Sequence, residues 1–423
     1  MAQESRWRER IVTWGWMLLA CYPLVDFVLR NTPIIRSTHV GSVWDKLILL
    51  IFGFFFIKES IEGRQVKLPP FYKAVLAFML LGVGYMMMDL SEPSLTFEGW
   101  RAVFLYMFVV FLAPFFIDAQ FAKRLLQASL WTGVLIALIA VYQWIVKAPI
   151  PAGWVDAGEH VRTRAYSIFG SPNVLGSYLV LMFPIAAGLA LTKGYTGKQR
   201  LIYGGMALLF AAALFMTYTR GAWMALFIAL LVIGALVDKR LFIGIVLAAI
   251  AVSFVPQIHA RVSELFTPLY WKKAALNGRI ARSLLTYDVM RKNPLFGAGL
   301  GHYGGAVAAR HFGTMYSDNY YAKTLAEMGL LGLFSFVALL FKVARDIYRH
   351  IWKRMIWKHG KFIEAGLYTG ILAVMIHNAV ENIFEVPAMN FLFWFMVSLI
   401  FIISREVTGQ TSITEEADAN HAA

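Results

Sequence analysis

Five arginines suggest the chemistry of this sequence most directly, because a guanidinium group binds phosphate through two parallel hydrogen bonds. Arg101, Arg164 and Arg220 stand at the ends of long apolar segments, and Arg279 and Arg282 stand in a long connecting segment. Arg279 and Arg282 are three residues apart near the start of a predicted helix, so they share a face beside free backbone N–H groups. That arrangement would suit a phosphate or pyrophosphate. Three of the arginines also have a simpler explanation: Arg220 could be a snorkelling turn residue, and Arg279 and Arg282 could lie on a solvated helix face.

Groups that could move a proton occur in two other stretches. Asp318 and Asn319 precede an apolar segment in "YSDNYYAKTLAEMGLLG", where they can cap the helix N-terminus. His377 and Glu381 are four residues apart in "MIHNAVENIFEVPAMN", so a continuous helix would place them on one face. Such a pair could shuttle a proton, or it could belong to an interfacial hydrogen-bonded cluster. Two ligands without a third are a weak signal for a metal site.

The elements that must position these residues are apolar helices. The chain has 423 residues, of which 59% are hydrophobic and 15% charged, whereas soluble domains carry roughly 25% charged residues. Long apolar stretches recur from end to end, and the alternating segments of about 10 residues that mark a β-barrel are absent. The sequence therefore predicts an all-α polytopic membrane protein. The net charge of +14 is distributed about a membrane rather than as a nucleic-acid-binding patch.

About twelve transmembrane helices are predicted, since a span needs about 20 mostly apolar residues. They cover residues 11–29, 41–57, 71–88, 100–117, 125–146, 172–191, 201–218, 222–237, 241–256, 319–341, 362–379 and 387–404. The first is expected to be an uncleaved helix. Thr219, Arg220 and Gly221 are expected to form the turn between the seventh and the eighth. Residues 1–404 form one membrane domain in this scheme, and residues 405–423 form a disordered tail.

The distribution of Lys and Arg predicts the orientation. The connections on the side of the N-terminus carry 21 of them and those on the other side 14, of which eight lie in one long loop at 257–318 that counts little. Both termini are therefore expected in the cytoplasm, and the five arginines at the outer surface. No comparable number of carboxylates stands at that level in the sequence.

The long outer loop is expected to be helical and functional, because structureless loops of this length are rare. Asn277 is its expected helix cap, and Pro294 ends the helix. The glycines of "GAGLGHYGG" that follow do not indicate a nucleotide site, because no strand precedes them. Their expected role is to let the backbone approach a ligand or a neighbouring helix closely.

Five stretches together resemble the O-antigen ligase and polymerase superfamily of bacterial membrane glycosyltransferases. They are "RAYSIFGSPNVLGSYL", "TYTRGAWMAL", "GRIARSLLTYDVMRKNPLFGAGLGHYG", "SDNYYAKTLAEMGLLGL" and, more loosely, "HNAVENIFEVPAMNFLFW". They occur in the family's order and cover about residues 160–400. The first 160 residues match only as apolar spans.

The resemblance implies a metal-independent glycosyltransferase without a cofactor, in the bacterial plasma (inner) membrane. Its donor would be a glycan on undecaprenyl pyrophosphate at the outer leaflet, and an acceptor hydroxyl would attack the anomeric carbon. Arg220 and Arg279 would hold the pyrophosphate, with Arg164, Arg282 and Arg101 also binding it. The implied supporting residues are Asn173, Asn319 and Glu381. Besides the lipid bilayer, other glycan-assembly membrane proteins are candidate partners, and nucleic acid is not.

One departure from the family bears on the reaction. Ligases of the family carry a histidine, proposed as the base, where this chain has Asp318, so we expect an aspartate base, with His377 as a second candidate. The departure favours a polysaccharide polymerase, which joins repeat units, over a ligase that transfers a finished glycan to a lipid, protein or wall acceptor. A lipid-glycan flippase or small-anion transporter is the alternative of another class, but it should place charges near the membrane midplane. A membrane scaffold would not need the arginines.

Overall fold

The computed structural model describes residues 2–33, 40–151, 163–237, 239–276, 278–313, 316–352 and 362–421. All regular elements in these ranges are helices, which confirms the predicted all-α class. The expected cap Asn277 lies outside the described residues. The division into a membrane domain and a disordered tail stays a prediction.

Seven helices are long and apolar enough to cross a membrane, or up to nine if each of two bent pairs counts as one span. Three shorter apolar helices cover the remaining predicted spans, so every predicted span falls on a helix or on a bent helix pair, but the count of twelve is not confirmed. The long ones are α4 (Val40–Ile61), α8 (Ala119–Ile145), α9 (Pro172–Leu191), α10 (Gly197–Met216), α17 (Tyr320–Trp352) and α19 (Pro387–His421), together with the span in which α6 (Pro93–Phe104) continues through η1 (Leu105–Phe108) into α7 (Val109–Phe116). The short ones are α5 (Tyr72–Met88), α11 (Arg220–Val237) and α18 (Ile363–His377).

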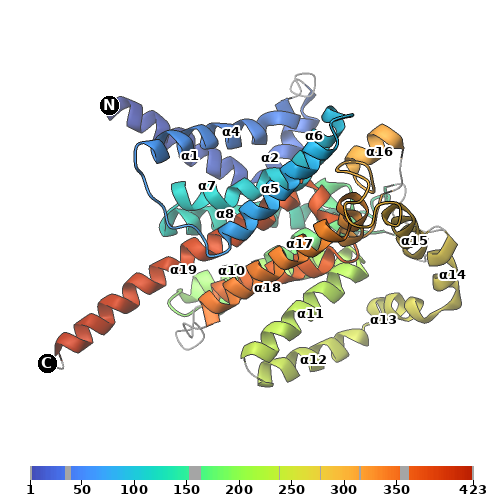
Figure 1. Ribbon diagram of the computed structural model, residues 1–423. Coiled ribbons are helices and arrows are strands. Elements are labelled where there is room, and N and C mark those ends of the chain that lie inside the picture. The colour runs from blue at the N-terminus through green and yellow to red at the C-terminus, as the bar shows by residue number, and fades with distance from the viewer. Residues whose placement is uncertain are drawn as a thin grey trace.

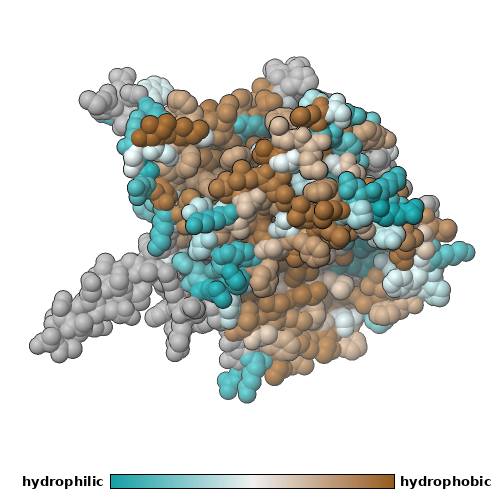
Figure 2. Space-filling model, in the orientation of Figure 1, coloured by the Kyte–Doolittle hydropathy of each residue, from teal (hydrophilic) through white to brown (hydrophobic). Residues whose placement is uncertain are grey.

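The apolar helices lie side by side, and the helices of the predicted outer loop gather at one end of them (Figure 1). That loop contains α13 (Pro256–Ser263), η3 (Glu264–Phe266), α14 (Pro268–Leu276), α15 (Arg279–Met290) and α16 (Ala306–Phe312). Hydrophobic residues cover most of the face in Figure 2, and many hydrophilic residues gather toward its left and right edges. This distribution is what a bundle that crosses a bilayer requires.

Helices α9 and α18 form the centre of the bundle through glycine contacts. A Cβ on Gly366 would lie 2.2 Å from the carbonyl oxygen of Pro184, and one on Gly370 would lie 2.6 Å from that of Leu181. Small residues let membrane helices pack backbone to backbone. The pairing brings the start of α9 next to the end of α18, where the polar residues Asn173 and His377 stand.

Three predicted boundaries are wrong. The first span is not one helix but α1 (Ala2–Ala20) and α2 (Tyr22–Asn31), bent by 86°, because Pro23 cannot continue a helix through this point. The ninth, 241–256, is α12 (Lys239–Ser253), bent by 93° from the helix that follows. Arg220 begins α11 rather than forming the turn, which centres on Tyr218 at a φ of 52°.

The glycine loop that follows α15 inserts into a break in α17. Gly329 has a φ of 61° and a ψ of −164°, and the freed carbonyls of Ala326 and Glu327 accept hydrogen bonds from the N–H groups of Ala298 (2.8 Å) and Gly299 (2.9 Å). A Cβ on Gly297 would lie 2.5 Å from the carbonyl carbon of Glu327. The expected close approach of this loop to a helix is therefore confirmed.

We predict that Gly329→Ala destabilises the protein by at least about 1–3 kcal/mol, because this backbone conformation is nearly exclusive to glycine. The added Cβ would also lie 2.4 Å from the carbonyl of Leu295. Gly84→Ala in α5 is the matched control, since a Cβ there meets nothing within 4 Å. The measurement is the melting temperature of each variant in the same detergent. Equal melting temperatures for the two variants would contradict the break in α17.

Candidate active site

A small cavity of about 70 Å³ lies between α15, the start of α17 and the segment after α18. Its polar lining includes Arg279, Arg282, Asp318 and Asn319. Arg279 is the first residue of α15, and the residue before it, Gly278, offers no side chain to cap the helix. The first N–H groups of α15 therefore lack a side-chain cap, which favours an anion at this end of the helix.

The two arginines of the cavity have different surroundings. Nη1 of Arg282 pairs with Oδ1 of Asp318. Arg279 is exposed, and within the described part of the chain no carboxylate lies within 4.0 Å of its guanidinium nitrogens. Arg279 is thus the cation of this cavity that a bound anion can reach without breaking an ion pair.

Asp318 and Asn319, which the sequence treats as joint caps, have separate contacts. Oδ1 of Asn319 accepts hydrogen bonds from the N–H groups of Tyr321 (2.9 Å) and Ala322 (3.1 Å), so Asn319 caps α17. Asp318 instead lies in its pair with Arg282. The expectation that Asp318 could be a simple cap is therefore wrong, and its carboxylate faces the cavity.

Glu381 lies next to this cavity and has an altered acidity. Burial raises the pKa of its carboxyl group to about 7, and the nearby charge of Asp318 adds to the rise, while Arg279 and a hydrogen bond from Asn173 oppose it. Nδ2 of Asn173, in the first turn of α9, donates that bond to Oε2 of Glu381. A carboxyl group with a pKa near 7 is well matched to accept a proton at neutral pH.

His377 does not share a helix face with Glu381, because α18 ends at His377. The imidazole is only 1% exposed, and its Nδ1 is hydrogen-bonded to the hydroxyl of Ser177. The start of α11 covers the other nitrogen, since a Cβ on Gly221 would lie 3.1 Å from Nε2. His377 is thus enclosed between helices, and it does not line the small cavity.

Arg164 holds backbone rather than facing a cavity. It is 6% exposed, and its Nε donates to the carbonyl of Thr217 at 2.9 Å. Its Nη2 donates to Oδ1 of Asn173 at 3.1 Å and to the hydroxyl of Thr219 at 3.2 Å. Arg164 therefore ties the turn before α11 to the start of α9 and fixes the amide that contacts Glu381.

Arg220 turns toward the outer helices. Its Nη1 lies 3.1 Å from Oε2 of Glu264 and donates to the carbonyl of Arg261 at 3.1 Å. Its guanidinium also lies 5.2 Å from the ring centroid of Tyr270. Nη1 of Arg261 binds the same carboxylate oxygen of Glu264 at 2.8 Å. These contacts connect the start of α11 to α13, η3 and α14.

Arg101 lies in a different place from the other four arginines. Helix α6 begins at Pro93, so Arg101 stands within the helix and not at the start of the span. It lines a separate cavity of about 900 Å³ that none of the other four arginines lines. The structure thus brings only Arg279 and Arg282 together around the small cavity. The expected lack of carboxylates beside the arginines is wrong for two of the five, because Glu264 pairs with Arg220 and Asp318 with Arg282.

A comparison with protein families supports one of the general classes. Residues 205–337 match the family model described as O-antigen ligase. The match confirms the resemblance of this part of the chain to the O-antigen ligase and polymerase superfamily. No curated protein matches it. The match runs from α10 into α17 and includes Arg220, Arg279, Arg282 and Asp318.

The family match and the apolar helices together indicate a multi-pass membrane protein with an activity of the O-antigen ligase or polymerase type. Such proteins act on lipid-linked glycans in a membrane. The match ends before α18, so Glu381 and His377 are placed beside the matched region by the structure alone.

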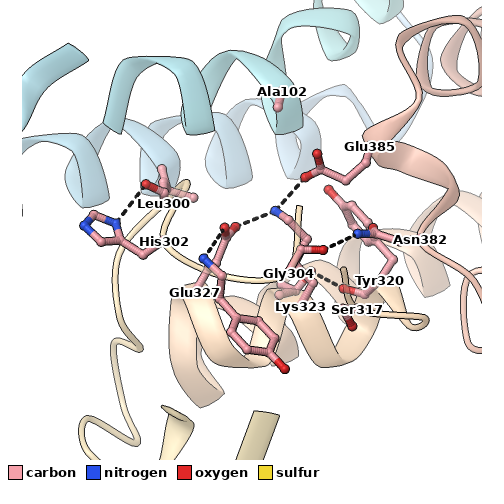
Figure 3. A network of polar contacts seen from close by, with 12 residues as sticks. Ala102, Leu300, His302, Gly304, Ser317, Tyr320, Lys323, Glu327, Asn382 and Glu385 are labelled. Carbon is pink, nitrogen blue, oxygen red and sulfur yellow. Dashed lines mark hydrogen bonds and ion pairs between the residues drawn. The ribbon is translucent and has the colours of Figure 1, made fainter. Parts of the chain in front are cut away.

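A buried cluster of charged side chains supports the glycine loop (Figure 3). The Lys323 ammonium lies 2.5 Å from Oε2 of Glu327 and 2.8 Å from Oε1 of Glu385, and all three side chains are at most 5% exposed. The two carboxylates also accept backbone N–H groups of the loop, from Tyr303 at 3.2 Å and from Ala306 at 3.1 Å.

The sequence indicates only part of this cluster. The spacing of Lys323 and Glu327 predicts their pairing on one helix face, and the structure confirms it. Glu385 was missed because it is 62 residues from Lys323 along the chain, and no local spacing connects the two.

Proposed function

We propose that this protein is a polysaccharide polymerase that joins undecaprenyl-pyrophosphate-linked repeat units at the outer leaflet of the plasma membrane. The observation that carries the proposal is the juxtaposition of two arginines and two carboxyl groups: Arg279, Arg282, Asp318 and Glu381 surround or adjoin one small cavity. This reaction needs cations that stabilise the charge of the leaving pyrophosphate and a base that accepts the proton of the acceptor hydroxyl.

In the reaction, an acceptor hydroxyl attacks the anomeric carbon of the donor glycan. The new carbon–oxygen bond forms as the bond to the lipid pyrophosphate breaks, and the electron pair leaves with the pyrophosphate. Arg279 and Arg282 stabilise the negative charge that grows on this leaving group. The hydroxyl proton passes to Glu381, which is the base because its pKa lies near neutral pH whereas Asp318 is engaged by Arg282.

Three other predicted site residues have positioning roles in this scheme. Arg164 holds Asn173, which orients Glu381. Arg220 connects α11 to the outer helices through Glu264 and Arg261. Asn319 caps α17 and so fixes the adjacent Asp318. No metal ion or cofactor is part of the proposed reaction.

The cavity of about 70 Å³ is small compared with typical ligand sites of about 300–1,000 Å³. It would therefore receive the charged end of a substrate, while the lipid and the sugars extend beyond it. The aspartate at the position of the ligases' histidine favours polymerisation over ligation.

The test is a reconstitution of the purified protein in vesicles with undecaprenyl-pyrophosphate-linked repeat units from its host. A ladder of products spaced by the mass of one repeat unit would support the polymerase. A single transfer to an added lipid, protein or wall acceptor, without a ladder, would show a ligase instead. If authentic donor and folded protein form no glycosidic bond, transport of the donor across the vesicle membrane is the activity to measure next, and the proposal fails.

A further inference from the structure

The proposed reaction does not use the cavity of about 900 Å³ that Arg101 lines. Its walls come from α2, α4, α6, η1 (Leu105–Phe108), η2 (Ser167–Phe169), α16 and the residues that join η4 (Ile383–Glu385) to α19. Helices α2, α6 and α16 meet at the end of the bundle where the outer helices gather (Figure 1). The volume lies in the upper part of the range of about 300–1,000 Å³ for binding sites.

The charged residues of this cavity are mostly arranged as donor and acceptor pairs. Nε of Arg30 lies 2.7 Å from Oδ2 of Asp26 on α2, and Nη2 of Arg310 lies 2.8 Å from Oε2 of Glu98, between α16 and α6. Arg101 differs, since no carboxylate of the described chain lies within 4.0 Å of its guanidinium nitrogens. Four cations and three carboxylates line the cavity, so its charge is nearly balanced: Arg30, Lys46, Arg101 and Arg310 with Asp26, Glu98 and Glu385.

Aromatic and apolar side chains complete the lining. Phe27, Tyr106, Phe169 and Tyr316 supply rings, and valines, prolines and leucine fill the spaces between them. A sugar ring presents apolar C–H faces, and its hydroxyl groups both donate and accept hydrogen bonds. A wall of rings with paired guanidinium and carboxylate groups complements those two properties. A multiply charged phosphate would instead require an excess of cations.

We propose that this cavity binds an oligosaccharide, namely the sugars of the acceptor substrate, with Arg101 donating hydrogen bonds to their oxygen atoms. The assignment rests on the proposed polymerase function. The two cavities are neighbours, since Tyr316 lines the large one and the next residue, Ser317, lines the small one. The N–H group of Ser317 donates a hydrogen bond to the carbonyl of Gly304 at 2.9 Å. The glycine loop, which rests on the charged cluster of Figure 3, therefore forms part of the wall between the two cavities.

The test measures binding to the full-length protein, without turnover. The probes are the repeat-unit oligosaccharide released from its lipid and freed of phosphate, and inorganic pyrophosphate. Arg101→Ala should weaken oligosaccharide binding about tenfold, the effect of losing one charged hydrogen bond, and leave pyrophosphate binding unchanged. Ala309→Trp should also weaken oligosaccharide binding, because Ala309 lines the large cavity and the indole would fill it.

Arg291→Ala is the matched control, since Arg291 is 63% exposed and lines neither cavity. Unchanged oligosaccharide affinity in both Arg101→Ala and Ala309→Trp would overturn the assignment. A loss of pyrophosphate affinity in Arg101→Ala would also overturn it, because the cavity would then be a phosphate site. The outcome is separable from that of the proposed function. Arg101-dependent sugar binding without any product ladder would reject the polymerase but keep the sugar site, whereas a ladder without such binding would reject the site alone.

Discussion

Arg279→Ala should lower the rate of glycosyl transfer by about 10²–10³, the effect of removing one preorganised donor from a developing negative charge. Arg279 lines the small cavity at the start of α15. The lost interaction strengthens as the pyrophosphate leaves, so the decrease should be in kcat and kcat/KM together rather than in KM alone. Single-turnover measurements with purified lipid-linked donor would separate the chemical step from product release.

Two further variants make this prediction specific. Arg279→Lys should recover only part of the rate, because an ammonium group keeps the charge but cannot bind an oxyanion through two parallel bonds. Arg291→Ala, near the end of the same helix, should leave the rate unchanged, since Arg291 pairs with Asp288 at the surface. A wild-type rate for Arg279→Ala would mean that the small cavity does not hold the leaving group.

The apolar spans could be predicted because burial in lipid depends on local composition. Each predicted span falls on a helix or on a bent helix pair, and the spacing of Arg279 and Arg282 placed them correctly on α15. The bend at Pro23 and the break at Gly329 were not foreseen. A proline or glycine inside an apolar run can be tolerated, and whether the helix breaks depends on what packs beside it. At Gly329 the neighbour is a loop from elsewhere in the chain, residues 294–299.

The directions of the arginine side chains could not be predicted. The sequence predicts that five arginines lie at the same depth relative to the membrane. It does not predict where each of them lies in the plane of the bilayer. Arg220 turns toward Glu264, and Arg101 faces another cavity. Glu264 and most of the walls of that cavity belong to other helices, so these surroundings exist only after the helices have assembled. The change of Glu381 from a supporting residue to the proposed base has the same origin, because its acidity depends on burial and on Asp318.

Glu381→Gln should lower the transfer rate by about 10²–10⁴, the contribution of a general base. The base must be ionised, and burial raises the pKa of Glu381 to about 7. The wild-type rate should therefore fall with decreasing pH below about 7 and reach a plateau above it, provided that the donor stays bound. In Glu381→Gln the residual rate should not follow this pH dependence, because the titrating group is gone. The measurement is the single-turnover rate at several pH values.

The hydrogen bond from Asn173 allows the titrating group to be assigned. This bond favours the ionised form of Glu381, so Asn173→Ala should raise the pKa and move the midpoint of the pH profile upward. Ser177→Ala removes the hydroxyl that contacts His377 and not Glu381, so it should leave the midpoint in place. If Ser177→Ala moves the midpoint and Asn173→Ala does not, the proton acceptor is His377 and the role assigned to Glu381 is wrong. A shift of the midpoint in Asn173→Ala alone would assign the pH dependence to Glu381, because Glu381 is the carboxyl group that Asn173 contacts.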